Sequence, residues 1–325
     1  MSVNFQNNRR PRKLRLFALG GIVFAAAMCS HAFAGGDIPE RIVSLAPGYD
    51  ETIIELGLQD KIAGVTDSSD YLAEVRKAAR IGSYVKPSIE KIIALKPDIV
   101  LAAGFAGQHP VARKLSAIGI RVVVMDDTRG IEEIFAVTRR IGDSLGAQER
   151  AGELLRRMET VIRDIRRKTA GLPRPRVYIE TGRDPLFTCG RGSFINDMVE
   201  ITGGKNIAVE INRPFPRISS EFVISRDPEV IILPRMGRNF GKEDLSRRKG
   251  WDRVSAVTTG RVYDDLDSYA ITIPSPRLIL HGLPELLKRI HPELAVKAEP
   301  GKNKPRTLAA VPAGRRPGVL ILFAR

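Results

Sequence analysis

The sequence predicts an α/β protein with two similar lobes, each containing a mainly parallel sheet, joined by a single long helix and facing each other across a cleft. Three observations predict this fold: an internal repeat at a spacing of 131 residues, alternation of short helices with buried apolar strands, and an amphipathic stretch between the halves. The chain has 325 residues, of which 43% are hydrophobic and 27% charged, which suits two globular domains.

The first 34 residues predict a cleavable signal peptide. Residues 1–15 carry five cations and no acid, residues 16–28 form an apolar run, and Ala32 and Ala34 supply the small residues of a cleavage site. The apolar run is shorter than the roughly 20 residues that a membrane-spanning helix needs. We therefore expect export to the periplasm. A lipid anchor on Cys29 is not expected, because the bulky Met28 precedes it.

The net charge of +15 is unevenly distributed along the chain. Five of the charges lie in the leader and a net six lie in the last 29 residues, which leaves +4 for the part between them. So modest a charge on a large body does not predict a nucleic-acid-binding surface. Residues 296–325 alternate Pro, Gly and Lys and predict a basic, disordered tail.

The internal repeat is the most informative feature. Residues 88–101 (SIEKIIALKPDIVL) align without gaps on residues 219–232 (SSEFVISRDPEVII). In each copy a serine can cap a short helix, an acid follows in its first turn, a proline stops it, and an apolar run predicts a buried parallel strand. GIRVV at 119–123 and GRVY at 260–263 repeat in the same order, which favours duplicated lobes over a chance match.

The elements follow in order along the chain. In the first lobe, residues 37–146, we expect strands at 42–45, 62–65, 99–102 and 122–125, and helices at 51–56, from Ser88, and at 111–118. Apolar residues recur at helical spacing from Gln148 to Lys168, and Gly171 and Pro173 follow, so a connecting helix is expected within 147–171. It would be roughly 30 Å long and would restrict the lobes to a small closing motion. The second lobe, 172–295, begins with a strand at 176–180.

The sequence contains none of the common catalytic motifs: no G-x-S-x-G elbow, no G-x-x-x-x-G-K-[ST] loop and no H-E-x-x-H. Gly190 to Ser193 could bind an anion at a helix start, but such turns before helices are common. Only His109 among the histidines falls in a predicted cleft loop, so no metal site is predicted. We therefore expect neither an enzyme nor a bound cofactor.

Aromatic and cationic residues gather in the loops after the predicted strands, where ligands of open parallel sheets bind. Flat apolar walls with a few charged groups suit a large ring-bearing ligand with acidic or amide edges. The alternative for each residue alone is packing under a loop, or a solvated arginine. These residues are Tyr49, Tyr71, Tyr84 and Phe105 in the first lobe, and Phe187, Arg191, Phe215, Arg217, Arg235, Arg238, Tyr269 and Arg277 in the second.

Short motifs spread over residues 41–293 carry a resemblance to a known family. They are IVSLAP (42–47), GSY (82–84), SIE (88–90), LKPD (95–98), PLFT (185–188), GGKN (203–206), PFP (214–216) and PSPR (274–277). In order and spacing the chain resembles the helix-hinged periplasmic binding proteins that serve ABC importers of vitamin B12, ferric siderophores and haem. The resemblance implies a monomer that delivers a small molecule to a membrane permease with its ATPase.

The resemblance also implies that Glu90 and Glu221 form salt bridges with the two halves of the permease. The repeat supports this independently, because it puts one carboxylate at the same place on each lobe, as a two-fold partner requires. The alternative role of each acid is to stabilise its own helix N-terminus.

Within the family, the resemblance implies a corrinoid ligand, with haem or a ferric siderophore as alternatives. Corrinoid-binding members have tryptophan where this chain has Tyr84 and Phe215, and haem-binding members place an iron-ligating tyrosine at the position of Tyr84. A siderophore would use the arginines. The ligand-binding residues that we expect are Pro47, Tyr49, Asp67, Tyr84, Phe105, Phe187, Phe215, Arg217 and Arg277. The rival classes are an enzyme on duplicated lobes, for which the sequence offers no nucleophile or nucleotide loop, and a ligand sensor.

Overall fold

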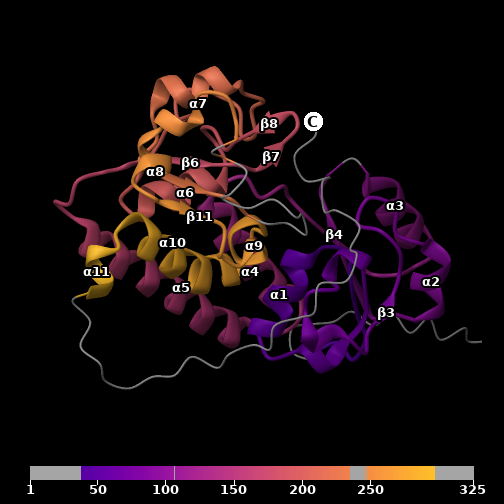
Figure 1. Cartoon of the computed structure of the whole chain (residues 1–325). Coiled ribbons are helices and arrows are strands. Elements are labelled where there is room, and N and C mark those ends of the chain that lie inside the picture. Colours follow the sequence, from indigo (N-terminus) through magenta and orange to yellow (C-terminus); the bar gives the residue numbers. More distant parts are fainter. Residues whose placement is uncertain (1–37, 106, 235–244, 246, 297–325) are drawn as a thin grey trace, which may run out of the picture. The chain divides into compact units, whose positions relative to one another are not determined.

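A computed structural model of the chain describes residues 38–105, 107–234, 245 and 247–296, which fall within one compact unit and contain two parallel sheets (Figure 1). The first sheet comprises β1 (Ile42–Ser44), β2 (Ile62–Val65), β3 (Ala79–Arg80), β4 (Ile99–Ala103) and β5 (Val122–Met125). The second comprises β6 (Arg176–Ile179), β9 (Lys205–Asn206), β10 (Val230–Ile232) and β11 (Val262–Tyr263). The α/β class is confirmed. The predicted signal peptide, the tail beyond Val296, Arg235 and Arg238 lie outside the described residues.

Four strands of the two sheets share one topology, as expected for a duplication, and β3 is an additional strand of the first sheet. The first has the order β3-β2-β1-β4-β5 and the second the order β11-β10-β6-β9, so β2-β1-β4-β5 corresponds to β9-β6-β10-β11. Both central pairs are parallel and start in register, with Ile42 opposite Ile99 and Val177 opposite Val230. A short antiparallel ribbon of β7 (Gly182–Arg183) and β8 (Leu186–Phe187) is added after β6.

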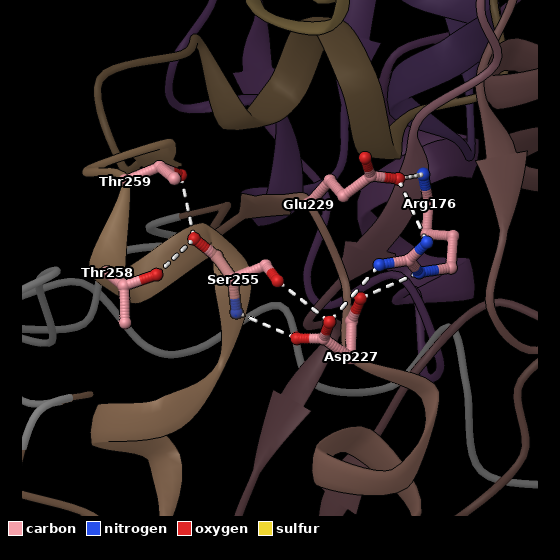
Figure 2. Close-up of polar contacts among 6 residues, drawn as sticks. All are labelled: Arg176, Asp227, Glu229, Ser255, Thr258 and Thr259. Carbon is pink, nitrogen blue, oxygen red and sulfur yellow. Dashed lines mark hydrogen bonds and ion pairs between the residues drawn. The ribbon is translucent and has the colours of Figure 1, made fainter.

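The duplication extends to the polar contacts at the start of the central strands. Arg41 donates its backbone N–H to the Asp98 carboxylate at 2.8 Å, and the Asp98 N–H donates to the Arg41 carbonyl at 2.9 Å. Arg176 and Glu229 make the same reciprocal pair at 2.9 and 2.8 Å, and Figure 2 shows the bond from the Arg176 N–H to the Glu229 carboxylate. Because Glu229 follows Asp98 by 131 residues, the pairing confirms the register of the predicted repeat.

The helices before β4 and β10 also end alike. Lys96 follows α2 (Ile89–Ala94) with φ +46°, and Asp227 follows α7 (Ser220–Arg226) with φ +41°, a left-handed conformation more usual for glycine at a helix end. Asp227 also accepts the backbone N–H of Ser255 at 2.8 Å and its hydroxyl at 2.7 Å, which fixes the start of α8 (Ser255–Thr258), as Figure 2 shows. These bonds from Ser255 lower the pKa of Asp227.

Helix α5 (Gln148–Thr169) runs between the two halves of the sequence, as predicted. Its buried face follows the helical spacing of Ala151, Leu154, Leu155, Met158, Ile162 and Ile165. Helix α4 (Ile131–Ser144), which the sequence analysis did not predict, packs along it, and α6 (Phe194–Ile201) and α10 (Leu283–Ile290) contact α5 as well. No helix among the described residues combines the length and apolar character needed to cross a membrane.

Side chains of each central strand alternate between two cores. Ile99, Leu101 and Ala103 of β4 join a cluster that continues through α5 to Val177 and Ile232 of the second sheet. The other face of the first sheet is covered by α2 and α3 (His109–Ala117). Residues of α7, with Trp251 and Val254, cover the other face of the second. The lobes therefore share one apolar core along α5.

The predicted first helix begins earlier than expected. Helix α1 spans Pro47–Glu55, with Pro47 in its first turn, where a missing N–H costs no hydrogen bond. The remaining helices are α9 (Ser268–Thr272), a π-helical turn (Leu278–Gly282) leading into α10, and α11 (Glu293–Val296).

Candidate ligand-binding site

Two predicted aromatic residues of the first lobe are brought together by a buried glutamine. Tyr84, from the loop after β3, stacks on Phe105, from the loop after β4, with ring centroids 4.9 Å apart. Gln108 donates from Nε2 to the carbonyls of Leu45 and Tyr84, both at 2.8 Å, and its Oε1 accepts the N–H of Ala103 at 2.7 Å. Gln108 therefore joins the loops after β1, β3 and β4. The sequence analysis did not identify it, because a lone Gln carries no motif.

The electrostatic surroundings of Tyr84 keep its phenol neutral. Burial, assisted by the Asp127 carboxylate after β5, raises the pKa of Tyr84 to about 12. Tyr49 lies in α1, where burial, Tyr84 and Asp127 raise its pKa well above the ordinary value. Pro47 and Tyr49, both predicted ligand residues, are buried in this part of the core. They shape the floor beneath the loops rather than an exposed surface.

Asp67 lies in the loop after β2 and is exposed. Its backbone N–H donates to the carbonyl of Gly82 at 2.9 Å, two residues before Tyr84. This bond connects the loop at 66–71 to the loop that carries Tyr84.

The second lobe brings Phe187, Phe215 and Arg217 together after β6. Phe187 on β8 forms an antiparallel bridge with Arg217, and the Phe215 ring meets Phe194 of α6 edge-on at 6.2 Å. Gly190 is required where the two segments pair, because a Cβ there would lie 2.3 Å from the carbonyl oxygen of Arg213. The glycine-rich turn is thus explained by packing.

A buried ion pair stands at the end of β6. Arg248 donates to Glu180 from both terminal nitrogens, at 2.6 and 2.8 Å, with 16% and 8% of the two side chains exposed. The guanidinium also lies over the Trp251 ring at 4.6 Å. A bidentate pair of this kind holds the 248–251 segment against the strand end.

Arg277, Tyr71 and Tyr269 meet in a different place from the aromatic residues described above. The Tyr71 and Tyr269 rings stack at 3.8 Å and 2°. Arg277 donates to Asp267 at 2.6 Å and lies 3.9 Å from Glu51 of α1. The predicted ligand residue Arg277 is therefore engaged by acids from both lobes.

Glu90 and Glu221 occupy equivalent positions in the first turns of α2 and α7, and both are exposed. Ser88 accepts the N–H of Lys91 at 3.3 Å, and Ser219 accepts that of Phe222 at 3.2 Å, so both predicted caps are confirmed. Each glutamate has its pKa lowered by its own backbone N–H and by the capping serine hydroxyl, which keeps it charged.

The surfaces around the two glutamates differ. Ile93, one turn after Glu90, is 42% exposed, and Ile118, one turn after Lys114, is 56% exposed; Lys114 lies near enough to Glu90 to lower its pKa. The repeat partner of Ile93 is Ile224, which is half-buried against the segment at 245–254. The first-lobe surface is therefore the more apolar of the two.

A family model described as periplasmic binding protein matches residues 42–269. The chain belongs to the periplasmic binding protein family. Members of this family are solute-binding transport proteins, and the aromatic rings in the loops described above suit the binding of a solute. Among the described residues of this periplasmic binding protein, no three His, Cys, Asp or Glu side chains are placed to hold a metal ion.

Similar proteins differ in the ligand that their names give. An uncharacterized ABC transporter substrate-binding lipoprotein, YvrC of Bacillus subtilis, is 31% identical over 78% of this chain and 81% of its own length. A vitamin B12-binding protein of Salmonella choleraesuis is 28% identical over 74% and 86%. The structure of the haem-binding protein RhuT from Roseiflexus, in apo form, is 25% identical with a TM-score of 0.69, covering 79% of this chain and 99% of that one.

Proposed function

We propose that this periplasmic binding protein captures a corrinoid between its two lobes and delivers it to an ABC importer, a permease with its ATPase. The observation that carries the proposal is the placement of aromatic rings at strand ends in both lobes, with Tyr84 and Phe105 in the first and Phe187 and Phe215 in the second. Rings of this kind offer flat apolar contact to a macrocycle.

The charges flanking these rings suit a ligand with both donors and acceptors at its edge. Asp67, Asp126 and Asp127 of the first lobe are exposed, and so are Arg191 and Arg217 of the second. Carboxylates accept hydrogen bonds and guanidinium groups donate them. A corrinoid, whose rim carries amide groups, satisfies both sides, and the vitamin B12-binding relatives support the same choice. Arg277, which we also propose as a ligand contact, is held by Asp267 and lies near Glu51 in this structure.

Haem is the second candidate, favoured by Tyr84 and by the haem-binding structural relative. A tyrosine that ligates iron does so as phenolate. Bound iron would take the place of the phenolic proton, so the haem alternative depends on the Tyr84 hydroxyl.

Delivery to the permease is proposed to use Glu90 and Glu221. They are charged, exposed and related by the internal repeat, so they can meet equivalent cations on a two-fold transporter. We further propose the lobe limits 37–146 and 172–295, a monomeric state, removal of residues 1–34, and a periplasmic protein without a lipid anchor.

The function is tested by titrating the protein, from Gly35 onwards, with cyanocobalamin in a calorimeter. We expect one-to-one binding at about −8 kcal/mol or better, which corresponds to micromolar affinity. A parallel titration with hemin uses Tyr84→Phe: loss of hemin binding on removal of the hydroxyl would establish the haem alternative. Failure of cyanocobalamin to bind would refute the corrinoid proposal.

A further inference from the structure

A buried carboxylate connects the two lobes. Glu51 of α1 has only 2% of its side chain exposed. Its Oε1 accepts the Tyr71 hydroxyl at 2.8 Å, and its Oε2 accepts the hydroxyl of Ser275, which follows it by 224 residues. Arg277 approaches the same carboxylate at 3.9 Å. A buried carboxyl group is stable only when it is hydrogen-bonded, so Glu51 needs these partners and losing them would be unfavourable.

A second set of contacts closes a ring around Glu51. Tyr71 stacks face to face on Tyr269 of α9 at 3.8 Å. Arg277 donates to Asp267 at 2.6 Å, and Asp267 accepts the backbone N–H of Tyr269 at 3.0 Å at the start of α9. Tyr71 and Arg277 are therefore each held by both Glu51 and the α9 segment. Separation of the lobes at this point would break ionic, hydrogen-bonded and stacking contacts together.

The backbones meet here as well. A Cβ on Gly48 of α1 would lie 2.7 Å from the carbonyl oxygen of Pro274, so α1 lies directly against the segment that carries Ser275. Because the two backbones approach closely, the two segments have less freedom to shift than if long side chains alone joined them. The position of Glu51 relative to Ser275 is thus set by main chain as well as by side chains.

The contact is linked to the candidate ligand loops. Tyr71 ends the loop that follows β2, and Asp67 in that loop donates its N–H to Gly82, just before Tyr84. A change at Glu51 can therefore reach the Tyr84 loop through two hydrogen bonds. On the other side, Ser275 and Arg277 lead into the π-helical turn at Leu278–Gly282, which contacts α5.

We propose that Glu51, Tyr71, Asp267, Tyr269, Ser275 and Arg277 form a latch that fixes the first lobe against the second and sets the separation of their ligand-contacting rings. Glu51 is a positioning residue: it acts on the ligand through the loop at 66–71. The ligand part of this inference rests on the proposed function, whereas the mechanical part does not. The latch adds to α5 a second constraint on lobe motion, at a point far from it in sequence.

The test measures the distance between the lobes in the ligand-free protein. Spin labels on Arg113→Cys of α3 and Ser225→Cys of α7 report it by double electron–electron resonance, since both positions are exposed. The native Cys189 will not be labelled, because it is buried and burial raises its pKa to about 12. The latch variants are Glu51→Gln, which replaces the carboxyl group by an amide, and Tyr71→Phe, which removes only the hydroxyl and keeps the ring stack.

Glu55→Gln is the matched control. Glu55 lies one turn further along α1, and its partner at 3.5 Å is Arg157 of α5, outside the latch. We expect one narrow distance distribution for the parent protein and for Glu55→Gln. For both latch variants we expect a shifted mean or a width increased about twofold, as lobe motion is released. Distributions identical to that of Glu55→Gln would overturn the proposal.

Two further measurements separate the causes of a negative result. Urea unfolding of each variant shows whether it folds; if Glu51→Gln does not, Tyr71→Phe and Ser275→Ala decide. Cyanocobalamin titration should show binding weakened about fivefold to fiftyfold in the latch variants, in line with a coupling between lobe geometry and ligand of typical size. If the parent binds no cyanocobalamin, the proposed function fails, and the distance measurement still decides the latch.

Discussion

Gly142 of α4 lies directly against Ala151 of α5. A Cβ added to Gly142 would stand 2.3 Å from the Ala151 Cβ, a distance that real side chains do not adopt. Glycine is present here because the two helices approach closely, whereas its backbone φ is ordinary for a helix. Helix α5 is therefore packed tightly against α4 along part of its length.

Replacing Gly142 with Ala should destabilise the protein by about 1–3 kcal/mol, since the helices must separate to admit the methyl group. Gly152→Ala, on α5, is the control. A Cβ there meets only the end of the Arg156 side chain at 3.6 Å, so we expect about 0.5–1 kcal/mol of added stability. Urea unfolding measures both values. Equal effects of the two substitutions would contradict the close-packing explanation.

Breaking the Arg248–Glu180 pair should cost about 3 kcal/mol, because Arg248→Met leaves a buried carboxylate without its cation. The control is Arg167→Met, whose partner Asp164 lies at 3.1 Å on an exposed face of α5. Its loss should cost less than about 1 kcal/mol. Adding Glu180→Gln to Arg248→Met should recover part of the lost unfolding free energy. No recovery would mean that packing on Trp251, not charge, carries the effect.

Reversing both proposed docking charges, in Glu90→Lys with Glu221→Lys, should abolish ligand-stimulated ATP hydrolysis by the importer and leave ligand affinity unchanged. Each single reversal should have an intermediate effect, which weakens at high salt because the contacts are exposed. Glu132→Lys serves as control, as this exposed acid also occupies a first turn, that of α4. The docking assignment is wrong if the double variant stimulates hydrolysis normally.

Tyr84→Ala and Phe215→Ala should each weaken ligand binding by about 1–3 kcal/mol through loss of ring contact. Calorimetry gives the affinities, and circular dichroism verifies folding, since Phe215 also packs on Phe194. Phe222→Ala removes a ring of the same size from α7, where it lies beneath Arg226 at 5.5 Å. Its affinity should match that of the parent. A loss of affinity in Phe222→Ala as large as in Tyr84→Ala would refute the placement of the site.

The contribution of Asp50 to stability should fall as pH rises above about 4. Burial raises the pKa of Asp50 from 3.8 to about 8, against the opposing effect of the Ser44 and Ser69 hydroxyls. The folded state therefore retains a proton that the unfolded state loses in this window. The favourable contribution is complete below about pH 4 and is lost as pH rises through 8, by up to about 1.4 kcal/mol per unit. Asp50→Asn should flatten the slope in urea unfolding. An unchanged slope would place the proton elsewhere.

The repeat allowed much of the fold to be predicted from sequence. Strands at 62–65 and 122–125 and the start of the long helix at Gln148 coincide with the structure, because buried β-branched runs and helical spacing are strong local signals. The start of α1 was missed, since Pro47 and Gly48 suggest a turn. A proline followed by a glycine is compatible with a turn and also with the first turn of a helix, which is where Pro47 lies.

Fewer residues of the candidate site than of the fold could be predicted from the sequence. Gln108 and Glu51 are single polar residues whose roles depend on carbonyls and hydroxyls brought close only by the fold. Arg277 was expected at the ligand because arginines in loops after strands often are. Its partner Asp267 lies ten residues away, but Glu51 lies more than two hundred residues away, and no local pattern joins them.

The difference between Ile93 and Ile224 has a consequence for symmetry. A transporter with two identical halves would meet two equal charges, Glu90 and Glu221, in unequal surroundings: an exposed isoleucine lies beside the first and a half-buried one beside the second. If docking proceeds as proposed, the seated complex is asymmetric even when the transporter alone is not.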